Sequence, residues 1–237
     1  MKAIVGKKLG MTRIFNDDGS LVSVTVVEAG PCVVLQRKTT QKDGYSAIQV
    51  GFGAKKEQKA NKAELGHHKK SGLKTASKYV TEFVVPEELN INAGEIIKPT
   101  VFDKGEKVSV TGTSIGKGFQ GTTKRWGFTI GQMTHGSKTH RGPGTLGPGT
   151  GKSNVFKGKK LPGHMGNKKA TIAGLEIVDI LEDKNVLLIS GAVPGPKNGY
   201  VIIKTKAAEF SADKIIKQAQ ENVVVEQEVS TENKASE

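Results

Sequence analysis

A glycine-rich motif in the middle of the chain has a spacing that could hold phosphate groups. The run GKGFQG at residues 116–121 fits the pattern G-x-G-x-x-G, in which a strand turns into a helix beneath a dinucleotide. That chemistry also needs a carboxylate about 20 residues later to bind a ribose hydroxyl, yet the next acidic residue is Glu176. The acidic residues of a kinase site and the Ser or Thr of a Walker loop are not in place either. We therefore expect no cofactor and no small-molecule substrate.

Three histidines in the same region could in principle hold a metal ion or act as a base. They are His135, His140 and His164. A zinc hydrolase combines three such ligands with a carboxylate base, and a Ser-His-Asp triad needs an acid to orient its histidine. Because no acidic residue is near them in the sequence, we predict no metal site, no catalytic residue and no enzymatic activity.

The strongest signal is the complete absence of acidic residues between positions 107 and 175, which we call the acid-free segment. It holds 12 of the 36 Lys and Arg residues and 16 of the 30 Gly residues, and therefore +12 of the net charge of +13. A segment that lies against polyphosphate has reason to exclude carboxylates, because each would face like charge at short range. A nucleic acid is the expected partner; no stretch approaches the ~18 apolar residues of a membrane-spanning helix, so we expect no membrane contact.

Cations and aromatic residues alternate along the acid-free segment in a way that suits RNA. Lys and Arg contact phosphates, Arg and aromatic rings stack on unpaired bases, and glycines let the backbone approach closely. The predicted RNA-binding residues are Lys117, Phe119, Lys124, Arg125, Trp126, His135, Lys138, His140, Arg141, Lys152, Phe156, Lys157, Lys159, Lys160, His164, Asn167, Lys168 and Lys169.

Several longer motifs resemble one family, the third large-subunit ribosomal protein (the L-three family). They are GTSIGKGFQGTTKRWGF at 112–128, THGSKTHRGPG at 134–144, VFKGKKLPGHMGN at 155–167 and GAVPGP at 191–196, with VGKKLGMTRIF at 5–15 resembling the bacterial N-terminus. The resemblance covers about residues 1–207 and leaves out the acidic end of the chain.

This resemblance implies a fold, a partner and a place of action. It implies a translation-protein-type β-barrel and a long irregular extension that reaches toward the peptidyl transferase centre, with residues 157–167 in its deep part. It also implies direct binding to large-subunit (23S) ribosomal RNA near its 3′ end, nucleation of subunit assembly, neighbouring large-subunit ribosomal proteins as partners, and a cytoplasmic, ribosomal location.

The alternative is an enzyme that acts on nucleic acid. It would need a carboxylate or metal cluster within the basic surface. The sequence places none within it, although Asp17, Asp18, Asp103 and Glu106 could in principle approach such a surface through folding.

The elements that must position the acid-free segment read as β-strands from both ends of the chain. Short alternating or β-branched runs at residues 21–27, 32–36, 47–50, 82–85, 107–111, 171–178, 185–189 and 200–204 are separated by Gly, Pro, Asp and Asn turns. We expect a mainly β protein whose barrel core comprises residues 1–53, 80–111 and 170–207. Residues 112–169 would form the extended RNA-penetrating loop, with a short helix within 118–126.

The remaining segments carry weaker signals. Residues 54–79 hold eight Lys and two Glu, and are expected to form a small α/β insertion whose helix spans 55–65. Residues 208–237 form an acidic tail, expected to be partly disordered after a short helix at 212–220. Cys32 is the only cysteine, which excludes internal disulfides and cysteine-based zinc sites, and we expect it to be buried.

Overall fold

The computed structural model describes residues 2–16, 18–87, 89, 91–147 and 154–205. The chain divides into two units, one made of residues 1–112 with those from 170 onward, the other of Thr113–Lys169. The acidic tail and its expected helix lie outside the described residues. No helix in the described part of the chain is long and apolar enough to cross a membrane.

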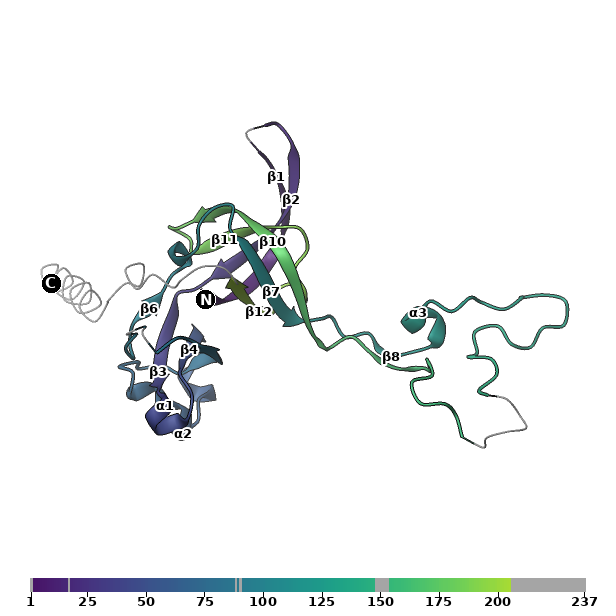
Figure 1. Cartoon of the computed structure of the whole chain (residues 1–237), viewed down its shortest axis with the longest axis horizontal. Helices are drawn as coiled ribbons and strands as arrows, with labels where there is room; N and C mark the ends of the chain where they lie inside the picture. The colour runs from purple at the N-terminus through teal and green to yellow at the C-terminus, as the bar shows by residue number, and fades with distance from the viewer. Residues whose placement is uncertain (1, 17, 88, 90, 148–153, 206–237) are drawn as a thin grey trace, which may run out of the picture. The chain divides into compact units, whose positions relative to one another are not determined.

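Six strands from both ends of the chain close into a barrel in the first unit (Figure 1). In order around the barrel they are β1 (Ala3–Phe15), β12 (Tyr200–Thr205), β7 (Lys107–Thr113), β10 (Lys169–Leu181), β11 (Val186–Ser190) and β2 (Leu21–Ala29). The predicted fold class, mainly β with a barrel, is confirmed.

The interior of the barrel follows from side-chain alternation along its strands. Ile203 of β12 lies opposite Ile4 of β1 and opposite Val110 of β7, and all three side chains have 0% exposure. Because the side chains of a strand alternate between its two faces, this row faces inward, while Tyr200, Ile202 and Lys204 of the same strand are only partly buried. Burial of such β-branched side chains stabilises the barrel by roughly 1.5–3 kcal/mol each.

A second sheet in the first unit corrects the predicted barrel boundaries. Its strands, in order, are β5 (Ser77–Val84), β4 (Ala47–Ala54), β3 (Cys32–Lys38) and β6 (Ile96–Ile97). Residues 1–53 and 80–111 were both assigned to the barrel from the sequence, but β3 and β4 of the first range and β6 and most of β5 of the second belong to this sheet instead. Strand spacing along the chain predicts strands but not their partners, and here the chain leaves the barrel at Gly30, which has a φ of +87° and follows β2.

The two sheets nevertheless share one core. The largest cluster of buried residues joins Ile4 and Val27 of the barrel to Cys32, Phe52 and Phe83 of the second sheet. Cys32 is buried as predicted, and its thiol donates a hydrogen bond to the carbonyl oxygen of Val5 at 3.3 Å. The second sheet is therefore packed against the barrel as part of one folded body.

The basic segment before β5 is helical, as predicted, but its helices begin and end elsewhere. A short 3-10 turn, η1 (Glu57–Lys59), precedes α2 (Lys62–Lys69), which continues through Gly66. The Glu64 carboxylate accepts hydrogen bonds from the Asn61 N–H at 3.1 Å and from the Lys55 ammonium at 2.7 Å, which defines the start. Near the other end of α2, Nδ1 of the buried His68 ring forms a hydrogen bond with the Glu64 carbonyl oxygen. Nε2 of the same ring accepts a hydrogen bond from the Ser77 N–H.

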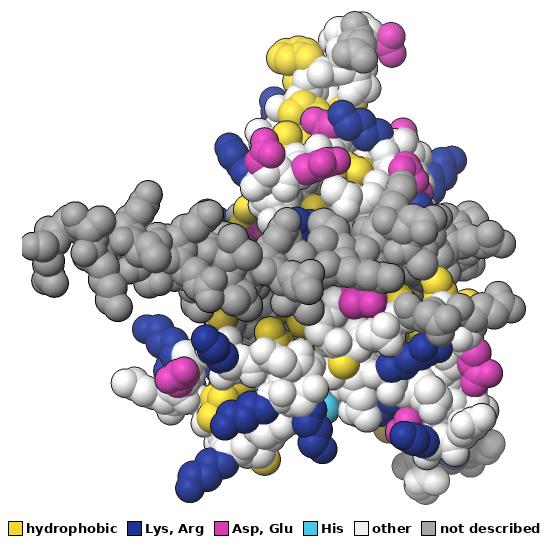
Figure 2. All heavy atoms as spheres, turned by 90° about the vertical axis from the view of Figure 1, so that its left-hand side faces the viewer, with side chains coloured by type: hydrophobic (Ala, Val, Ile, Leu, Met, Phe, Trp, Pro, Cys, Tyr) yellow, Lys and Arg dark blue, Asp and Glu magenta, His cyan; other side chains and the backbone are white. Residues whose placement is uncertain are grey.

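Other short elements complete the first unit. They are α1 (Thr40–Asp43), which was not predicted, and η2 (Pro99–Val101). In Figure 2, Lys and Arg mix with Asp and Glu over the upper, barrel part of this unit, while Lys and Arg predominate over the lower part.

The described part of the second unit, residues 113–147 and 154–169, is mostly irregular and contains three short elements. These are β8 (Gly118–Gln120), α3 (Thr122–Trp126) and β9 (Gly163–Met165). The expected short helix is present over only part of 118–126, because residues 118–120 pair with β9 in a two-stranded antiparallel ribbon. At the base of the unit, the Ser114 N–H donates to the Lys168 carbonyl and the Asn167 N–H to the Ser114 carbonyl.

Candidate nucleic-acid interface

The positive charges of the second unit have no acidic residue within that unit to balance them. Residues 113–169 contain no Asp or Glu, so their Lys and Arg side chains cannot form a salt bridge within the unit. In the first unit, by contrast, Lys38 pairs with Glu82 at 2.7 Å and Lys55 with Glu64 at 2.7 Å. The field of the unpaired cations favours a polyanion as the partner of the second unit.

Most of the predicted RNA-binding residues present their side chains to solvent. The exposed ones are Lys117, Phe119, Lys124, Trp126, His135, Lys138, Arg141, Phe156, Lys157, Lys160, His164, Asn167, Lys168 and Lys169. The side chains of Arg125, His140 and Lys159 are half-buried. Lys152 lies outside the described residues.

Arg125 and Trp126 hold α3 against the returning chain. The Arg125 guanidinium donates to the Leu161 carbonyl oxygen at 2.7 Å, and the Trp126 indole N–H donates to the same oxygen at 2.9 Å. The Arg125 guanidinium carbon lies 4.9 Å from the centre of the indole ring, and the Lys160 ammonium lies 5.7 Å from it. Both distances are typical of cation–π contacts. These two predicted RNA-binding residues therefore have an internal structural role, which the sequence did not reveal.

His140 helps to shape a loop that begins after α3. One ring nitrogen, Nδ1, lies 2.8 Å from the Gln132 carbonyl oxygen, and the Gly131 N–H donates to the His140 carbonyl at 2.9 Å. Gly131 is needed there, because a β-carbon would come 2.2 Å from the Thr139 carbonyl oxygen. This part of 134–151, for which the sequence predicted no conformation, is an irregular loop closed by backbone hydrogen bonds.

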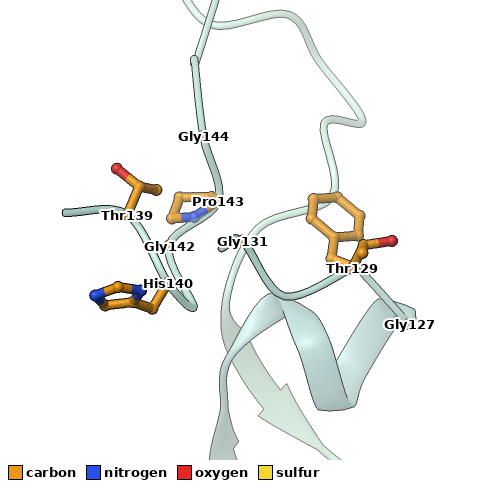
Figure 3. A pocket seen from close by; sticks show the side chains of 9 residues that line it. Gly127, Thr129, Gly131, Thr139, His140, Gly142, Pro143 and Gly144 are labelled. Atoms are coloured by element: carbon orange, nitrogen blue, oxygen red, sulfur yellow. The ribbon is translucent and has the colours of Figure 1, made fainter. Parts of the chain in front are cut away.

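The loop surrounds a hollow of about 470 Å³ (Figure 3). Its lining is mostly glycine and small side chains: Gly127, Phe128, Thr129, Gly131, Thr139, His140, Gly142, Pro143 and Gly144. No acidic or Cys side chain belongs to this lining, so it offers His140 as its one titratable group and no metal-binding set. Glycine-lined backbone of this kind suits close approach of a bulky polymer.

The family model described as "Ribosomal protein L3" matches residues 84–186. The protein named "Large ribosomal subunit protein uL3" from Syntrophotalea carbinolica is 55% identical over 205 residues, which cover 86% of this chain and 97% of that relative.

The chain belongs to the ribosomal protein L3 family. The resemblance inferred from the sequence motifs is thereby confirmed. The family match includes the whole acid-free segment, from β7 through the second unit into β10, so the exposed cations lie within the part of the chain that the family model matches.

The carboxylates that an enzyme would need have other roles in the described part of the chain. Asp103 and Glu106 accept hydrogen bonds from the Lys2 ammonium at 2.9 and 3.1 Å in the first unit. Asp18 is an exposed turn residue between β1 and β2, and Asp17 lies outside the described residues. Among the described residues no group of three or more His, Cys, Asp or Glu could hold a metal ion. Membership of a ribosomal protein family indicates a structural rather than a catalytic role.

Sequence reasoning missed the apolar side chains that the second unit exposes. Ile115 and Met133 are each 57% exposed. Ile130, Leu146 and Val155 are also exposed. They are single apolar residues in a glycine-rich segment without periodicity, so the only available signal was their isolation from any strand or helix pattern.

Proposed function

We propose that this chain is a structural component of the large ribosomal subunit and that its second unit binds large-subunit ribosomal RNA. The observation that carries the proposal is the acid-free, solvent-exposed set of cations and rings in residues 113–169. The relative from Syntrophotalea carbinolica is named as a large ribosomal subunit protein. The polyanion that fits such a surface in this family is therefore ribosomal RNA.

The proposal extends to the details that the family resemblance implies. The RNA contacted is 23S rRNA near its 3′ end, the binding nucleates subunit assembly, and neighbouring large-subunit proteins pack on the first unit. Residues 157–167 lie toward the peptidyl transferase centre. The protein acts within the ribosome as a support for RNA geometry, and it performs no chemistry itself.

Each class of side chain has a distinct part in this binding. Exposed lysines such as Lys138, Lys157 and Lys168 neutralise phosphates and release counterions. Exposed rings stack on bases that are not paired. Arg125 and Trp126 hold the shape of α3 and its surroundings, so that the lysines are presented on a defined framework.

Binding of the full chain to a 3′-terminal fragment of 23S rRNA, measured by filter retention across a salt series, tests the proposal. If about six phosphates are neutralised, the log–log slope of affinity against salt concentration is roughly −4 to −6. A flat salt dependence, or equal affinity for a neutral polymer, would overturn it.

A pair of triple variants locates the binding surface. Replacing exposed Lys138, Lys157 and Lys168 with Gln should make the slope less steep by about 2 to 3. The matched control replaces exposed Lys42, Lys184 and Lys197 of the first unit with Gln, which lowers the net charge equally and should leave the slope nearly unchanged. Equal effects of the two variants would mean that overall charge, and not the second unit, determines binding.

A further inference from the structure

We propose that Phe119 and His164 together form a stacking site for unpaired RNA bases on one face of the β8–β9 ribbon. The inference rests on the proposed function of the second unit and adds to it the kind of RNA element that is recognised. It assigns base contact to Phe119 and His164 as a pair, and phosphate contact to Lys117.

The two rings are direct cross-strand neighbours. Phe119 of β8 lies opposite His164 of β9 in the antiparallel register. Side chains of such a pair project from the same face, with β-carbons about 4.5–5.5 Å apart. The Phe119 side chain is 77% exposed and His164 is exposed. The pair therefore leaves an uncovered aromatic surface on the ribbon, which is available to stack on a partner.

The other face of the ribbon is covered by α3. The residues that alternate with the two rings project to that face, among them Gly163. A β-carbon at Gly163 would come 2.6 Å from an Arg125 guanidinium nitrogen, so this face packs against the Arg125 side chain. Phe119 and His164 consequently lie on the face that points away from α3.

The surroundings of the pair favour a nucleic acid over an apolar protein surface. At Gly121, two residues after Phe119, a β-carbon would have no atom within 4 Å, so the space on that side of the ring is open. Exposed Lys117 lies two residues before Phe119, and its backbone N–H donates to the Met165 carbonyl at 2.9 Å, which keeps this cation next to the ribbon. Adjacent aromatic rings on a sheet with a nearby cation are a recurring arrangement for stacking successive bases while a phosphate is held.

Oligonucleotides that differ only in their bases test this site. The full chain is titrated with fluorescein-labelled r(A)12 and with an abasic 12-mer of the same charge, and binding is followed by anisotropy. The wild-type chain should bind r(A)12 more tightly. The double variant Phe119→Leu/His164→Leu should bind r(A)12 about 5- to 100-fold more weakly, as expected for loss of base stacking, with unchanged binding of the abasic strand.

Two further variants make the result specific to the rings. Phe119→Tyr retains an aromatic ring and should retain the preference for r(A)12, which separates stacking from a general disturbance of the ribbon. Phe15→Leu removes an exposed ring of the first unit, 76% exposed and outside the predicted RNA-binding set, and should leave the preference intact.

The outcomes separate this site from the proposed function. Salt-dependent binding of both strands with no effect of the double variant would overturn the stacking site and leave the proposed function standing. Loss of r(A)12 binding in Phe119→Tyr as well would also overturn it. Absence of salt-dependent binding by the wild-type chain to either strand and to rRNA would overturn the proposed function itself.

Discussion

Gly166 lies directly against Ile115 at the base of the β8–β9 ribbon, so that a β-carbon at position 166 would come 2.1 Å from the Ile115 carbonyl oxygen. Its φ of +75° is also a conformation that side chains with a β-carbon rarely adopt. The obstacle is backbone rather than a mobile side chain, so it cannot move aside without opening the ribbon. Only glycine therefore allows the two chain segments to pair at this point.

Gly166→Ala should accordingly loosen the ribbon without unfolding the first unit. A strain of about 2 kcal/mol corresponds to roughly 30-fold faster amide exchange of Lys117 and Asn167, whose N–H groups donate to the Met165 and Ser114 carbonyls. Gly142→Ala is the control, because its β-carbon would make an ordinary 3.5 Å contact with the Thr139 methyl group. Equal exchange in the two variants would contradict the argument.

The Cys32 thiol should be unreactive in the folded protein. Burial raises its pKa to about 12. At pH 8 the reactive thiolate is therefore almost absent, and the side chain has 0% exposure. Ellman's reagent should modify no thiol in the native wild type and one per chain in guanidinium. An exposed thiol introduced by Ser20→Cys should react at once; rapid reaction of native Cys32 would show that the shared core opens readily.

Local sequence patterns predicted the strands better than the sheets. The runs at 200–204 and 107–111 appear as β12 and β7, since β-branched alternation is a local property. That Cys32 pairs with Phe52 and Ile97 in a second sheet is a non-local choice, and strand spacing carries no information about it. The helix after residue 54 was placed too early because its start depends on the bonds that Glu64 makes with Asn61 and Lys55.

The candidate interface was predictable in its chemistry but not in its geometry. The segment without acidic residues located the candidate RNA-binding cations, because charge composition can be counted directly in the sequence. The pairing of Phe119 with His164 joins residues 45 positions apart in three-residue strands, which are too short for any periodicity. The hydrogen bonds of Arg125 and Trp126 to Leu161 are likewise non-local, and these residues look the same in sequence as those that face solvent.

The only tryptophan of the chain provides a test of the contacts around α3. Arg125→Lys retains the charge but loses the planar group that lies 4.9 Å from the Trp126 ring centre. We expect a red-shifted emission maximum and stronger acrylamide quenching, since water gains access to the ring. Lys124→Gln changes an exposed neighbour on the same helix and should leave the emission unchanged. A shift in the control alone would contradict the assigned role of Arg125.

Lys2 should stabilise the barrel through its two carboxylate partners. Its side chain is 7% exposed and pairs with Asp103 and with Glu106, itself 14% exposed. Lys2→Met should lower the free energy of unfolding by about 2 kcal/mol, because Glu106 is left buried without its cation. Lys104→Met, which removes the 67%-exposed partner of Asp179, is the control and should cost at most about 1 kcal/mol.

The Lys2 contribution should also depend on pH in a defined direction. Burial by itself lowers the pKa of Lys2, but the hydrogen bonds to Asp103 and Glu106 outweigh it and raise the pKa above its ordinary value of 10.5. The stabilisation is therefore complete below about pH 10.5 and is lost as pH rises through the higher folded-state value. Urea unfolding followed by far-UV circular dichroism should show a constant difference between wild type and Lys2→Met at pH 7 and 9, and a smaller one at pH 11. A difference that grows at pH 11 would contradict the raised pKa.

Removal of the second unit should leave the first unit folded. The strands that lead into and out of it, β7 and β10, are neighbours in the barrel, and the Thr111 and Thr171 hydroxyl oxygens are 2.9 Å apart. A linker of about four Gly and Ser residues in place of 116–168 can therefore join them as a hairpin. Far-UV circular dichroism should retain a cooperative β-protein transition, and Cys32 should stay protected from Ellman's reagent.

Affinity of the deletion variant for the 23S rRNA fragment should fall at least about 10-fold, and the salt slope should become shallower, since the lost cations no longer release counterions. We expect the lysines of 54–79 to account for the binding that remains. An unfolded deletion variant would mean that the second unit contributes to the core, and undiminished binding would place the RNA contacts on the first unit.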